Sequence, residues 1–134
     1  MDASLHTNSE HYGLNMKNVE FFDDGSGGSC FLEVASSPFT VAVSFFFDDP
    51  PISKFIEALE GIDRTLIGEA KLGQQYEEPY FVLRGDGKGH VSVSGVLTDF
   101  SIDQQRLEFS FVTDQTALRP FIVGLKEICG VNAT

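Results

Sequence analysis

Three pairs of adjacent acidic residues have the side-chain type and spacing that most suggest chemistry in this chain. They are Asp23–Asp24, Asp48–Asp49 and Glu77–Glu78. The two aspartate pairs could bind a hard cation, but calcium requires about six or more oxygen ligands in a defined loop, and Glu77–Glu78 are most simply a solvated loop. Paired acids could also serve as general acid and base, but neighbours on a loop do not establish the separation that this chemistry needs. We therefore predict no metal site, and we interpret Asp48–Asp49, which precede two prolines, as the start of a helix.

Nucleophilic and phosphate-binding chemistry have equally little support. Cys30 and His90 could form a dyad, yet a cysteine in an apolar strand is far more often a small core residue. Two glycine-rich segments, 24–28 and 85–89, do not lead from a strand into a helix, and GSGG lacks the lysine and hydroxyl residue of a nucleotide-binding loop. Both segments are typical of hairpin turns. The sequence predicts no catalytic residue and no cofactor, which favours a binding protein over an enzyme.

The charge balance gives the clearest information about partners. The 134 residues include 20 acidic and 9 basic residues, for a formal net charge of −11. Nucleic acid and anionic membranes present negative surfaces, so we predict that neither is a ligand. A basic protein partner would instead be attracted and steered by this charge.

The cysteines and the first residues of the chain predict a cytoplasmic location. Cys30 and Cys129 are far apart in sequence, and residues 1–13 lack the basic start and apolar run of a secretion signal. No apolar run approaches the length that crosses a bilayer. We expect two reduced thiols in a cytoplasmic protein.

Hydrophobic periodicity predicts seven strands and two helices. In residues 40–47, the odd-numbered residues from Val41 to Phe47 share one face, and Phe46 on the opposite face indicates that this second face is also partly covered. The predicted strands are 18–22, 30–35, 40–47, 65–72, 80–84, 90–97 and 106–112, with a helix after residue 48 and a second one from Ala117 that Gly130 stops.

These elements predict an α+β fold. Residues 1–16 are polar and without period, so we expect a flexible N-terminal tail, followed by a single α+β domain over residues 17–134. The domain is expected to contain a curved, largely antiparallel sheet of about seven strands, with two amphipathic helices packed on it. Thirteen phenylalanines and no tryptophan indicate that phenylalanine dominates the core.

Two segments of the chain match each other without a gap at a spacing of 66 residues. Residues 41–62 align with residues 107–128, and ordinary residue frequencies would give about one or two identities. Both an internal ββ-β-α repeat and convergence of two similar strand–helix units remain open. The identical pairs are Ser44/Ser110, Phe45/Phe111, Asp48/Asp114, Phe55/Phe121, Ile56/Ile122, Leu59/Leu125 and Ile62/Ile128.

The closing part of the chain resembles a known family. A strand that ends in Asp-Gln-Thr at residues 114–116 is followed by Leu118 and an amphipathic helix. Upstream lie a G-x-A-x-L segment at residues 68–72 and a glycine-turn hairpin. Over residues 18–128 this pattern is similar to small bacterial immunity proteins of the WapI type. The resemblance implies a cytosolic antitoxin that inhibits a toxin by binding, and it transfers no catalytic residue.

Our leading hypothesis is therefore a non-enzymatic cytosolic protein that neutralises a cognate toxin by covering a basic active surface. One alternative is a small-molecule-binding module with a phenylalanine-lined pocket. Another is a dimeric structural or assembly subunit that associates through a sheet edge or the face bearing Phe46. The expected partner contacts lie in loops at hairpin ends: Asp23, Asp24, Glu77, Glu78 and Asp86.

Overall fold

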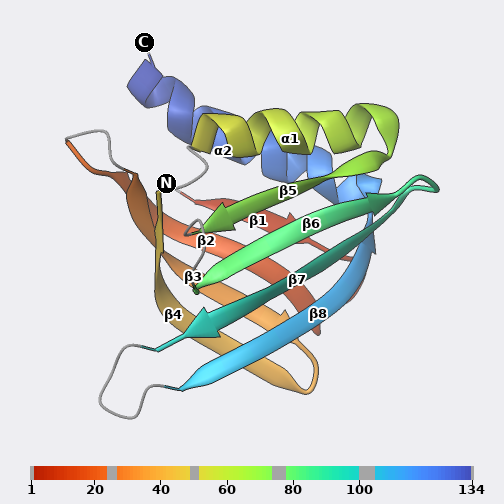
Figure 1. The fold of residues 1–134 in the computed structure, drawn as a ribbon, viewed down its shortest axis with the longest axis horizontal. Coiled ribbons are helices and arrows are strands. Elements are labelled where there is room, and N and C mark those ends of the chain that lie inside the picture. The colour runs from red at the N-terminus through yellow and green to blue at the C-terminus, as the bar shows by residue number, and fades with distance from the viewer. Residues whose placement is uncertain (1, 24–26, 49–51, 74–77, 100–104, 134) are drawn as a thin grey trace.

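The chain folds into two four-stranded antiparallel sheets and two helices (Figure 1). The computed structural model describes residues 2–23, 27–48, 52–73, 78–99 and 105–133. Sheet A has the order β1-β2-β3-β4, and sheet B has the order β5-β6-β7-β8. The strands are β1 (Ala3–His6), β2 (Tyr12–Phe21), β3 (Gly28–Ser36), β4 (Phe39–Phe47), β5 (Ile67–Gly73), β6 (Tyr80–Asp86), β7 (His90–Thr98) and β8 (Arg106–Asp114), and the helices are α1 (Ile52–Thr65) and α2 (Leu118–Ala133), preceded by the short 3-10 turn η1 (Gln115–Ala117).

The α+β class is confirmed, but the expected single sheet of about seven strands is not what forms. The described residues contain eight strands, divided between two sheets that are both simple antiparallel meanders. Alternating apolar residues point from each sheet into a shared core, and in β6 and β7 the outward-facing Val82 and Val96 are buried as well. Phe45 and Phe81 meet there with ring centroids 5.4 Å apart, so rings from the two sheets pack directly together.

The expectation of a flexible tail is wrong for much of residues 1–16. Ala3 pairs with Met16 and Leu5 pairs with Leu14 in an antiparallel ladder between β1 and β2. All four side chains are buried in the core. Because these apolar residues alternate with polar ones, the segment is a half-buried hairpin, and its polar composition reflects only the outward positions.

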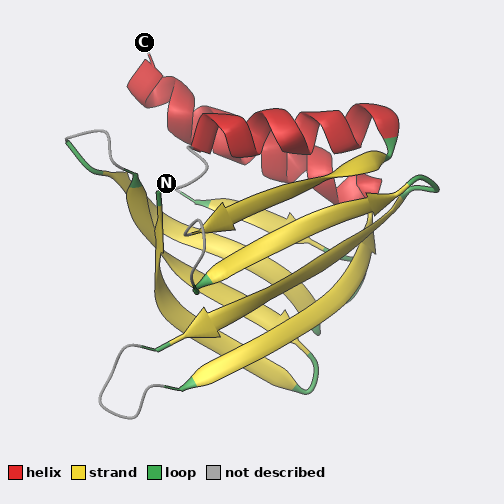
Figure 2. Ribbon diagram, in the orientation of Figure 1, coloured by secondary structure: helices red, strands yellow, loops and turns green. Residues whose placement is uncertain are grey.

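Both helices lie on the same side of the strands, as Figure 2 shows. Helix α1 packs along β5, helix α2 packs along β1, and the two helices also pack against each other. The predicted stripe of α1 is buried at Phe55, Ile56, Leu59 and Ile62. Helix α2 continues to Ala133, so the predicted stop at Gly130 is wrong. Neither helix, within the described residues, is long and apolar enough to cross a membrane.

The two helices meet at positions that the 66-residue alignment makes equivalent. The rings of Phe55 and Phe121 pack edge to face with centroids 6.4 Å apart, and Lys126 Nζ lies 2.7 Å from Glu60 Oε2. Among the residues that the structure describes, each half of the chain contains four strands followed by a helix, one strand more than the predicted ββ-β-α unit. A common origin of the two halves, with a pseudo-twofold axis between the helices, stays a prediction.

Candidate partner-binding face

The outer face of sheet A is the side that points away from the core. Strand alternation places on it the side chains between the buried ones, and each of them is at least partly exposed. Helix α1 lies along the edge strand β5 and helix α2 along the edge strand β1 (Figure 1). Among the described residues, neither helix covers this face. The outer face of sheet A comprises Ser4, His6, Gly13, Asn15, Lys17, Glu20, Ser29, Phe31, Glu33, Ala35, Thr40, Ala42, Ser44 and Phe46.

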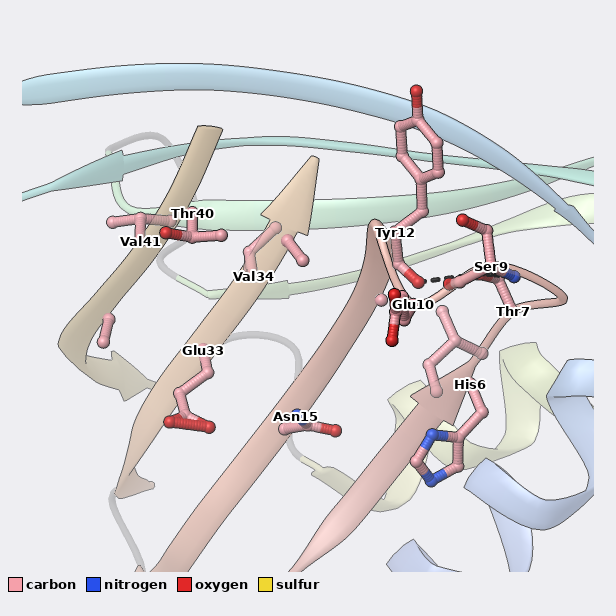
Figure 3. Close-up of a pocket in the computed structure, with 14 residues that line it drawn as sticks. His6, Thr7, Ser9, Glu10, Tyr12, Asn15, Glu33, Val34, Thr40 and Val41 are labelled. Carbon is pink, nitrogen blue, oxygen red and sulfur yellow. Dashed lines mark hydrogen bonds between the residues drawn. The ribbon is translucent and has the colours of Figure 1, made fainter. Parts of the chain in front are cut away.

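One half of this face contains an open hollow of about 690 Å³. Gly13, Ala35 and Ala42 bring only small side chains to the outward positions of three neighbouring strands, which leaves the depression. Asn15 and Glu33 are directly paired across β2 and β3 and lie beside it. Figure 3 shows these two side chains on adjacent strands of the hollow.

The turn between β1 and β2 forms one rim of the hollow and presents Glu10 there. The Thr7 hydroxyl oxygen lies 2.7 Å from the carbonyl oxygens of both Ser9 and Tyr12 and accepts a hydrogen bond from the Ser9 N–H (Figure 3). The His11 N–H donates to the Ser9 hydroxyl oxygen at 3.1 Å. These local bonds hold the backbone of the turn that carries Glu10.

The other half of the outer face bears two exposed phenylalanines. Phe31 is 41% exposed and Phe46 is 42% exposed, so the expectation that Phe46 marks a covered second face is wrong. Phe31 pairs with Ser44 and Phe46 pairs with Ser29, which makes the two rings diagonal neighbours on β3 and β4. The two rings therefore form a small exposed apolar pair among the polar side chains of this face.

Charges on sheet A are strongly one-sided. Lys17 is the only lysine or arginine in residues 2–48, and its Nζ lies 2.8 Å from Glu33 Oε1. The hydrogen bond from Glu33 raises the pKa of Lys17. The same segment contains seven acidic residues: Asp2, Glu10, Glu20, Asp23, Asp24, Glu33 and Asp48.

Of the predicted acidic contacts that the structure describes, Glu78 and Asp86 are engaged at opposite ends of β6. Asp23 is exposed just after β2, whereas Asp24 and Glu77 lie outside the described residues. Glu78 is already engaged, because Arg106 donates to it from Nε at 2.9 Å and from Nη2 at 2.7 Å. The hydrogen bonds from Arg106 lower the pKa of Glu78.

Asp86 has a structural role in the hairpin between β6 and β7. Its Oδ1 accepts hydrogen bonds from the Lys88 N–H at 2.7 Å and the His90 N–H at 3.1 Å, and its Oδ2 lies 3.0 Å from His90 Nδ1. The bond from the Lys88 N–H is the largest cause of the lowered pKa of Asp86. Strand β6 separates Asp86 from Glu78, and a strand of that length spans roughly 20 Å.

The dyad considered for Cys30 and His90 does not form. Cys30 is buried in β3, and burial raises the pKa of its thiol to about 12, so it is protonated at neutral pH. His90 instead lies against Asp86. Within the described ranges, no three His, Cys, Asp or Glu side chains are placed together as metal ligands.

The comparison with protein families identifies the chain. Residues 5–130 match the model of the immunity protein WapI-like family. The chain belongs to this family. The WapI-like match begins within β1 and ends within α2, so it includes both sheets and both helices. No curated protein and no solved structure matches this WapI-like chain.

Sequence reasoning missed the outer face of sheet A in this WapI-like protein. The alternation that identified β3 and β4 also placed Phe31 and Phe46 opposite the buried residues. That signal is present in the sequence, but an apolar residue on the second face of a strand fits a covering layer equally well. The hollow had no comparable signal, because it depends on the register that brings Gly13 beside Ala35.

Proposed function

We propose that this protein is an immunity protein that neutralises a cognate bacterial toxin in the cytoplasm by binding to it, without catalysing a reaction. The observation that carries the proposal is the match to the WapI-like immunity family over residues 5–130. An immunity protein acts on a protein partner, and occlusion of the toxin's active surface requires affinity and shape rather than a reacting group.

The charge of the chain supports a toxin with a basic surface. The net charge of −11 would speed association with a positive surface. Because salt screens this attraction, the complex should weaken as the salt concentration rises. Toxins that cleave nucleic acid need positive surfaces for their substrate. The acidic loop residues predicted as contacts are Asp23, Asp24, Glu77, Glu78 and Asp86. Exposed Asp23, just after β2, is the described one that the proposal keeps as a toxin contact, because Glu78 is held by Arg106 and Asp86 by the β6–β7 hairpin.

Co-expression with the toxin encoded beside its gene tests the proposal. Cells that express the toxin alone should stop growing, and cells that also express this chain should grow. Purified toxin and this chain should elute as one complex at low salt and bind more weakly at high salt. A toxin that keeps its full activity in the presence of excess chain would refute the proposal. An inactive toxin variant is the control for expression load.

A further inference from the structure

We propose that the outer face of sheet A is the surface on which a basic protein docks, with the hollow receiving a lysine or arginine and the two phenylalanines making the apolar contact. The partner is the toxin of the proposed function, on which this assignment rests. The face spans β1 to β4, and it places Glu10 and Glu33 at the hollow and Phe31 and Phe46 beyond it.

The size of the face fits a protein partner. Four strands at about 4.8 Å spacing and up to ten residues long give a surface of roughly 500–600 Å². A standard interface takes about 800 Å² from each partner. The sheet face supplies most of such an area, and the adjoining turns supply the rest, including the β1–β2 turn with Glu10 and the end of β2 with Asp23.

The two rings supply the apolar contact at one end of the face. Aromatic residues in an interface carry a large share of binding energy when the partner removes them from water. Phe31 and Phe46 each have about two fifths of their surface exposed in the free protein, so docking would bury them further. Glu20 lies in the same cross-strand row as Phe46, through Ser29, and places a carboxylate at the rim.

The hollow is suited to a cationic side chain. Asn15 and Glu33 flank it, Glu10 lies at its rim, and a carboxylate can accept several hydrogen bonds, so Glu33 can bind an entering guanidinium in addition to Lys17. Small-molecule pockets are mostly apolar and enclose most of their ligand. This depression is open, and none of the described residues that line it is a phenylalanine.

The charge distribution selects a basic partner over a second copy of the chain. In sequence, residues 2–48 contain seven acidic residues and one lysine, while the other eight basic residues follow residue 48. On the outer face itself, Glu20, Glu33 and the rim residue Glu10 outnumber Lys17. Two copies docked through this face would place like charges opposite each other, which costs affinity. A positive surface would neutralise them.

Binding of the cognate toxin to single-site variants tests this assignment. Phe31→Thr and Phe46→Thr replace each ring with a residue that also favours strands, and each should raise the dissociation constant by about tenfold or more. Glu20→Lys should lower the association rate and flatten its salt dependence. The matched controls are Ile67→Thr, on the outward side of β5 in sheet B and 65% exposed, and Glu127→Lys, exposed on α2. Both controls should bind like the wild type.

The outcomes separate this assignment from the proposed function. If the wild type and all variants, at unchanged melting temperature, bind and neutralise the toxin equally, the function stands and the docking face is wrong. If the wild type does not bind, both are overturned. If the wild type is a dimer in sedimentation and Phe46→Thr converts it to a monomer, the face is a homodimer contact and the toxin assignment is wrong.

Discussion

The adjacent residues Phe45 and Phe46 offer a matched test of the two faces of sheet A. Phe45 is fully buried, with its ring 5.4 Å from that of Phe81 and 6.4 Å from that of Phe47. Truncation of such a ring to alanine removes its burial and leaves a cavity, at a cost of about 3–5 kcal/mol. Phe46 points outward and is 42% exposed. Its partial burial stabilises the fold by roughly 1–2 kcal/mol, and no enclosed cavity forms when it is shortened.

Urea unfolding of Phe45→Ala and Phe46→Ala measures this difference. With a slope of about 2 kcal/mol per molar urea, Phe45→Ala should lower the midpoint by about 1.5–2.5 M and Phe46→Ala by about 0.5–1 M. The binding assay should show the reverse order, because only Phe46 lies on the proposed docking face. Equal losses of stability in the two variants would refute the assignment of buried and exposed faces in β4.

Three further predictions concern the hairpin, the glycines and the thiols. Asp86→Asn should lower the melting temperature at neutral pH. The pKa of Asp86 is lower in the folded than in the unfolded state, so its carboxylate stabilises the fold above about pH 4, and this stabilisation is lost as the pH falls further. The melting temperatures of variant and wild type should therefore converge in acid. In the urea assay, Gly95→Ala should lower the free energy of unfolding by about 1–3 kcal/mol, because its Cβ would lie 2.4 Å from a β6 carbonyl oxygen. Gly61→Ala in α1 should raise the free energy of unfolding by about 0.5–1 kcal/mol, because its Cβ would meet nothing within 4 Å and alanine favours the helix. A thiol reagent should modify Cys129 before the buried Cys30, and faster reaction of Cys30 would contradict its core position.

Local patterns in the sequence predicted most of the individual elements. Alternation identified β3, β4 and β8, and the apolar stripe identified α1, because strands and helices each repeat with a fixed period. The N-terminal hairpin was missed because only Ala3, Leu5, Leu14 and Met16 mark its inner face. The division into two sheets was also missed, since a local pattern does not determine which strands pair.

The candidate site was less predictable than the fold. Acidic residues at hairpin ends were chosen by charge, but Glu78 lies against Arg106, which is 28 residues away, and Asp86 binds its own hairpin. Ion pairs across strands depend on register, which the sequence does not display. The exposure of Phe46 depends likewise on where the helices pack, and they pack against other strands.

Chemical-shift mapping by NMR tests the central claim most directly. The labelled 134-residue chain would be titrated with unlabelled toxin. The largest amide shifts should fall on sheet A at Gly13, Asn15, Phe31, Glu33 and Phe46, with the α1 and α2 amides little changed. Shifts concentrated on the helices or on sheet B, or no shifts at a saturating concentration of toxin, would contradict the account.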